Sequence, residues 1–88
     1  MALQKDIIFK GLKVPKAYIA ITGLQVDKIE DNFQVSASIG TYTSKGSEPL
    51  EELRFPVQFT LNLKGENIIA QAYAAMKLDD RWKGGADV

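Results

Sequence analysis

The sequence predicts an α+β fold: an antiparallel β-meander of three to four strands, with one C-terminal helix packed on its apolar face. Two segments, "FQVSASIG" at residues 33–40 and "RFPVQFTLNL" at residues 54–63, alternate apolar and polar residues, which is typical of strands with one buried face. A third, "GENIIAQAYAAMKL" at residues 65–78, changes to helical spacing. The apolar stripe of this helix needs a surface to cover, and the apolar face of the meander is the large candidate.

The first half of the chain predicts two strands. "DIIFK", residues 6–10, is a short β-rich run that ends at Gly11. Residues 17–29 predict a longer strand with a bulge at Gly23, because a glycine inside a strand packs no side chain and often marks a bend. Residues 30–32, "EDN", predict a turn, since Asp and Asn bond to the local backbone.

The second half predicts two more strands, a long loop and the helix. Residues 44–52 are polar and contain Gly and Pro, so they predict the longest loop. Pro56 lacks an N–H donor, so the strand at 54–63 is an edge strand or Pro56 faces outward. The predicted buried stripe of the helix consists of Ile69, Ala72, Tyr73 and Met76.

Length and charge limit the remaining choices. Eighty-eight residues make one domain, here assigned to residues 1–78, and residues 79–88 are set apart as a C-terminal tail without periodicity. Eleven basic and eleven acidic residues give a net charge of zero, which argues against nucleic acid as a partner. The apolar runs fall short of the ~20 residues of a membrane span, and no cysteine offers a disulfide. A signal-peptide pattern is also missing, so we expect a protein used where it is made.

The sequence offers little reactive chemistry, and we predict no enzyme, no cofactor and no metal site. Histidine and cysteine are both missing. The carboxylate pairs 30–31, 51–52 and 79–80 lie in turns or at element ends, where adjacent side chains diverge and are solvated. A carboxylate-dependent hydrolase is therefore the weakest hypothesis. The lysines at 5, 10, 13 and 16 form a small basic patch or protect a strand edge, and the missing interleaved aromatics favour the edge.

Four residues are candidate partner contacts. Trp82 lies beyond the predicted helix in a polar stretch, where it either folds back over the core or docks into a neighbouring chain. Ile7 and Phe9 lie on the short N-terminal strand, whose exposed edge offers a route to sheet extension between molecules. Tyr42 lies on a strand and is either core edge or exposed contact.

Several segments give the chain a family resemblance. "MALQKDI", "AYIAITGL", "ENIIAQAYAAMKL" and the terminal "GADV" resemble a family of small proteins encoded by tailed bacteriophages and prophages. Tails in that family often read "PEF" before an acidic stretch, where this chain has Asp80, Arg81 and Trp82. The resemblance implies a structural protein of the tail or baseplate region, located in the virion or the host bacterial cytoplasm, with no catalytic residues to carry over.

Two functions follow as hypotheses. The first is a non-enzymatic bacteriophage structural or assembly protein that packs against copies of itself, as a homo-oligomer in the assembled state, or against other phage structural proteins. The alternative is a small intracellular binding module that modulates a phage or host protein without entering the particle.

Overall fold

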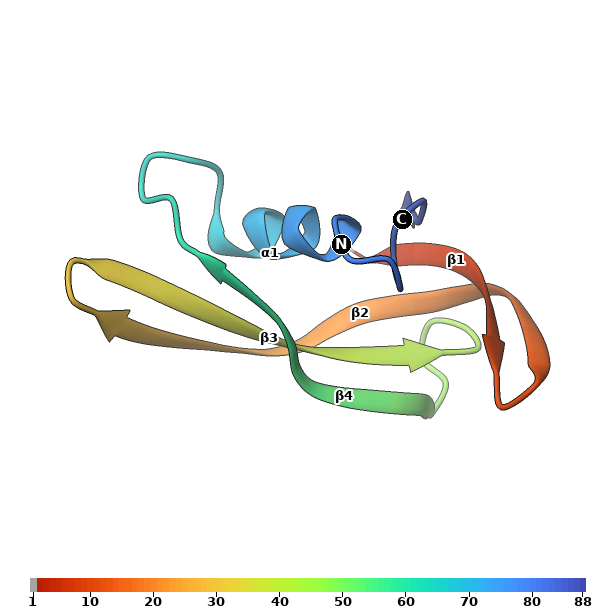
Figure 1. Cartoon of the computed structure of the whole chain (residues 1–88). Helices are drawn as coiled ribbons and strands as arrows, with labels where there is room; N and C mark the ends of the chain where they lie inside the picture. Colours follow the sequence, from red (N-terminus) through yellow and green to blue (C-terminus); the bar gives the residue numbers. More distant parts are fainter. Residues whose placement is uncertain (1) are drawn as a thin grey trace.

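The protein is a five-stranded antiparallel sheet with one helix on one face, as described for residues 2–88 by a computed structural model (Figure 1). The α+β class with a mostly antiparallel sheet is confirmed, whereas the expected three to four strands are five. The strands follow the order β4-β3-β2-β1-β5 across the sheet. The elements are β1 (Leu3–Phe9), β2 (Leu12–Ile29), β3 (Asn32–Tyr42), β4 (Pro49–Thr60), α1 (Ile68–Lys77) and β5 (Ala86–Asp87).

The long β2–β3 hairpin forms the centre of the sheet and extends to one end of the molecule (Figure 1). Its turn is at residues 30–31, between Ile29 and Asn32, as predicted. The ladder shifts register between Ile21 and Gly23, so the predicted bulge at Gly23 is confirmed. Both N-terminal strands begin earlier than expected: β1 begins at Leu3 instead of residue 6, and β2 begins at Leu12 instead of residue 17.

The strand after the long loop begins earlier than predicted. Residues 49–53 pair with β3, with Pro49 opposite Tyr42 and Leu53 opposite Ile39, so the irregular segment is residues 43–48. The strand ends at Thr60, which leaves Leu63 outside the sheet and 73% exposed. As β4 is the last strand at one side of the sheet, the edge position expected from Pro56 is confirmed.

Irregularities in three neighbouring strands lie side by side and bend the sheet across its middle. Gly23 of β2 lies opposite Ser38 of β3, and β4 shifts register over the same stretch. The β4 bulge contains Phe55 at a φ of 56°, a conformation that bulky residues rarely adopt. Its N–H donates to the Ser38 hydroxyl at 3.3 Å, which satisfies a donor that the interrupted ladder leaves without a strand partner.

Helix α1 covers the sheet near this bend. The Asn67 side chain caps its first turn by accepting from the Ala70 N–H at 2.9 Å. Ala72, Tyr73 and Met76 are buried as predicted, whereas Ile69 is 48% exposed and does not belong to the buried stripe. The core combines residues of the sheet, the helix and the C-terminal stretch: Leu3, Ile19, Ala37, Ile39, Val57, Tyr73, Met76 and Trp82.

The stretch 79–88, which the sequence sets apart as a tail, is integrated into this fold. Trp82 is 4% exposed and belongs to the core cluster, and β5 pairs with Leu3 and Gln4 of β1. Backbone hydrogen bonds in both directions join Ala2 and Val88, at 3.1 and 3.0 Å. Periodicity could not reveal this, because a single tryptophan and a two-residue strand carry no repeating pattern.

Candidate functional site

A groove of about 980 Å³ lies at the end of the molecule opposite the β2–β3 turn. Four parts of the chain form it: the β1–β2 hairpin, the beginning of β4, the turn after α1 and Thr41 of β3. We call this site the groove. Its apolar lining consists of Ile7, Ile8, Phe9, Val14, Pro15, Ile19, Leu53 and Trp82, and its polar lining of Lys5, Asp6, Lys10, Lys13, Thr41, Glu51 and Arg81.

The β1–β2 hairpin is shaped by its turn and by a bulge. Lys10 and Gly11 take positive φ values of 49° and 81° at the turn, a pair of conformations suited to a tight two-residue hairpin. The ladder shifts register beside Asp6, where Lys16 also has a positive φ. The Lys16 N–H donates to an Asp6 carboxylate oxygen at 2.7 Å, which fixes this irregularity. Figure 1 shows the hairpin curving away from the plane of the sheet beyond this point.

The lining of the groove is continuous with the core. Ile19 and Trp82 belong to the core cluster, and Ile7 and Leu53 are half-buried residues packed against it. Ile8, by contrast, is 72% exposed. A ligand lying in the groove would therefore cover apolar surface that the fold itself leaves in contact with water, which is the main source of binding free energy at such sites.

Charged side chains surround the apolar lining, and one of them is fixed. The Arg81 guanidinium donates to both carboxylate oxygens of Asp79, at 3.0 and 2.8 Å, and lies 4.4 Å from the centre of the Trp82 ring. These hydrogen bonds lower the pKa of Asp79 from 3.8 to about 2 and raise the pKa of Arg81. Lys5 donates to the Arg81 carbonyl at 3.2 Å, which ties β1 to the same turn.

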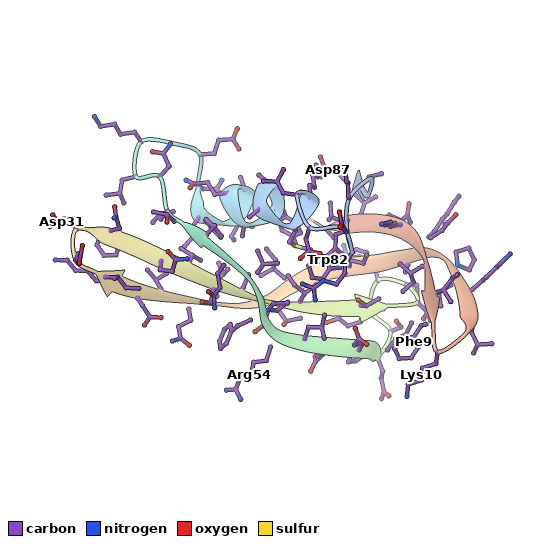
Figure 2. All side chains as sticks on the ribbon, in the orientation of Figure 1. Phe9, Lys10, Asp31, Arg54, Trp82 and Asp87 are labelled. Carbon is purple, nitrogen blue, oxygen red and sulfur yellow. The ribbon has the colours of Figure 1, made fainter. Side chains whose placement is uncertain are left out.

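Three of the four candidate contacts from the sequence meet in the groove. Ile7, Phe9 and Trp82 all line it (Figure 2 labels the last two). For Trp82 the fold-back role is the one observed, because its side chain is buried within its own chain. Tyr42 is not part of the groove: it lies beside Tyr18 with ring centres 6.1 Å apart, next to Thr41 and Ile19, whose side chains point to the other face.

Sequence reasoning did not find the groove itself or its contributions from Val14, Leu53 and Arg81. Alternation gave no signal for the start of β4, because Leu50 and Leu53 are three residues apart and the strand shifts register between Pro49 and Glu51. Lys5, Lys10 and Lys13, which the sequence singled out as a cluster, do line the same site.

Within residues 2–88, no group of three or more acidic side chains is arranged to hold a metal ion, and no helix has the length and hydropathy of a membrane span. Burial raises the pKa of Tyr73, but this side chain lies in the core beneath α1.

Comparison of the chain with protein-family models, with curated proteins and with solved structures finds no match.

Proposed function

We propose that this protein is a non-enzymatic structural or assembly protein of a bacteriophage, associated with the tail or baseplate region, which acts through protein–protein contacts. The observation that carries the proposal is the groove: a preformed apolar surface with a charged border, at one end of a small domain. Such a composition suits a segment of another protein, since apolar lining supplies affinity and border charges supply orientation.

The edges of the sheet add a second kind of contact. β5 pairs with Leu3 and Gln4, so among the described residues the outer edge of β1 from Lys5 to Phe9 has no strand beside it. β4 forms the opposite edge of the sheet. An extended segment of a partner can add to such an edge through backbone hydrogen bonds while its side chains reach the neighbouring groove.

The proposal that the protein is part of a phage particle rests on the resemblance of its segments to phage proteins, and it can be tested directly. We expect mass spectrometry of purified particles to detect this protein in constant ratio to the tail proteins. Detection of the protein in infected or induced cells but not in purified particles would replace this proposal by the alternative, a binding module that acts on a phage or host protein outside the particle.

The role of the groove is tested by one exposed residue. Ile8→Asp changes a side chain that is 72% exposed and lies opposite Lys13, so the fold should tolerate it. We expect this variant to fold, by circular dichroism, and to be at least tenfold depleted from particles. Leu63→Asp is the matched control, because Leu63 is equally exposed but lies in the loop before α1. Equal incorporation of both variants would exclude the groove as the contact surface.

A further inference from the structure

The two ends of the molecule carry complementary surfaces. The groove lies at one end, and the other end is the turn region of the β2–β3 hairpin, which we call the tip and define as residues 25–32. Every residue of the tip is exposed, and the molecule is 44 Å long against 23 and 21 Å in the other directions. In Figure 2, Asp31 marks the tip, and Phe9 and Lys10 lie at the end with the groove.

The tip exposes apolar side chains that its own fold does not cover. Val26 is 46% and Ile29 is 56% exposed, on a hairpin that ends in the polar turn at Glu30 and Asp31. Val26 lies opposite Val35 and Ile29 opposite Asn32, so the two apolar side chains lie on opposite faces of the hairpin. A hairpin with an apolar residue on each face is suited to insertion into a groove with apolar walls.

Charge distinguishes the two ends. The tip carries three carboxylates and one lysine: Asp27, Glu30, Asp31 and Lys28. The groove is bordered by four cations and two carboxylates: Lys5, Lys10, Lys13, Arg81, Asp6 and Glu51. The chain as a whole has no net charge. Asp79 pairs with Arg81, so the border of the groove keeps a smaller positive excess, which is opposite in sign to the excess at the tip and favours association of the two ends.

A chain cannot place its own tip in its own groove. The tip belongs to a paired hairpin whose strands are continuous with the central sheet, so its position is fixed relative to the groove. A second copy is therefore the occupant that the charges select. Since the two contacting surfaces differ, a bound pair of copies still has one free tip and one free groove. Further copies can bind to these, and the contact would propagate into a ring or a filament.

We propose that the groove of one copy binds the tip of a second copy, with Ile29 and Val26 against the apolar lining and the tip carboxylates near Lys10 and Lys13. This inference rests on the proposed function, a protein that acts by packing against protein, and it names the partner and both surfaces of the contact.

Charge reversal at each end tests the contact. We expect the wild-type chain at low salt to sediment, with rising concentration, as species larger than the 9.7 kDa monomer. Lys10→Glu with Lys13→Glu in the groove, or Asp27→Lys with Asp31→Lys at the tip, should each give a monomer. An equimolar mixture of these two variants should assemble again, and so should one chain that carries all four changes, because reversed tips then meet reversed grooves.

The matched control exchanges charges elsewhere. Lys64→Glu with Glu66→Lys reverses two exposed residues of the loop before α1 and should assemble like the wild type. Circular dichroism establishes that each variant is folded. A wild type that stays monomeric at all concentrations, or paired reversals that fail to restore assembly, would overturn the inference.

Cysteine cross-linking gives a second test that does not depend on charge. The chain has no cysteine, so Ile8→Cys and Ile29→Cys introduce the only thiols. After mild oxidation of their mixture, we expect the heterodimer at least fivefold above that formed by Ile8→Cys with Leu63→Cys. Equal yields would exclude the contact. A chain that is found in particles but fails these tests would retain the proposed function and lose this interface.

Discussion

The middle of the β2–β3 hairpin and its tip are built from the same two strands but differ in burial. Around Ile19 and Ile39 the hairpin lies beneath α1 and the C-terminal stretch, and both side chains are 1% exposed. Beyond Gln25 every residue of β2 is exposed, with Val26 and Ile29 about half exposed, although Val35 of β3 is still buried. Strand β2 is therefore longer than the core requires. We expect substitutions at the tip to leave the free energy of unfolding nearly unchanged, whereas substitutions in the middle of the hairpin should lower it.

The largest expected effect is a loss of stability on substitution in the covered core. Trp82→Ala removes a side chain that is 4% exposed and lies among the core residues. We expect a loss of about 3–5 kcal/mol in the free energy of unfolding, measured by urea titration. A loss below about 1 kcal/mol would show that Trp82 is dispensable for the core and would restore its role as a contact to another chain.

A smaller effect is expected at the bend. The Tyr73 hydroxyl accepts a hydrogen bond from the Ile21 N–H at 3.1 Å, beside the register shift of β2. Tyr73→Phe keeps the ring and removes the acceptor, so we expect a loss of about 1–3 kcal/mol. Hydrogen exchange at the Ile21 amide should accelerate more than at Val35, which lies in the regular part of β3; uniform acceleration would contradict a local role.

The turn beside Trp82 predicts a pH dependence. Because the folded-state pKa of Asp79 is about 2, below its usual 3.8, the unfolded chain binds the proton more readily. The stabilisation is fully present above about pH 4 and is lost as the pH falls toward 2. We expect the melting temperature of Asp79→Asn to fall less over this interval than that of the wild type. Asp80→Asn, at an exposed neighbouring position, should behave like the wild type.

The smallest effect on stability is expected at the exposed tip. Ile29→Ala at the tip should change the free energy of unfolding by less than about 0.5 kcal/mol, because the side chain is 56% exposed. The same change should weaken self-association in sedimentation experiments. A large loss of stability would show that the tip supports the fold and is no independent surface.

The sequence predicted the regular parts of this fold because regular elements repeat their burial pattern. Alternation identified β3, and the helical period identified α1 with Ala72, Tyr73 and Met76 buried. The edge position of Pro56 and the bulge at Gly23 followed from the chemistry of single residues. Ile69 was misplaced because a stripe of two turns leaves the limits of the covered face undefined.

The groove was less accessible to sequence reasoning because it depends on distant segments. Ile7, Phe9 and Trp82 were each identified as candidate contacts, but only the packing of the C-terminal turn against β1 brings them together. Residues 49–52 at the start of β4 were assigned to a loop because they are mostly polar, and Phe55 takes a backbone conformation that no pattern of hydrophobicity predicts. A charged border assembled from three parts of the chain leaves no local signature.

The extra residue in the bulge of β2 also determines which side chains of the following residues face the core. Before the bulge, odd-numbered side chains such as Ile19 and Ile21 face the helix, whereas after it the even-numbered Leu24 and Val26 lie opposite the core residues Ala37 and Val35. Thr22 is the extra residue, and it allows Ile21 and Leu24, three positions apart, to pack against the same core. Without the bulge, a strict alternation along these residues would place Ile21 and Leu24 on opposite faces of the sheet, and one of the two would lose its contact with the core.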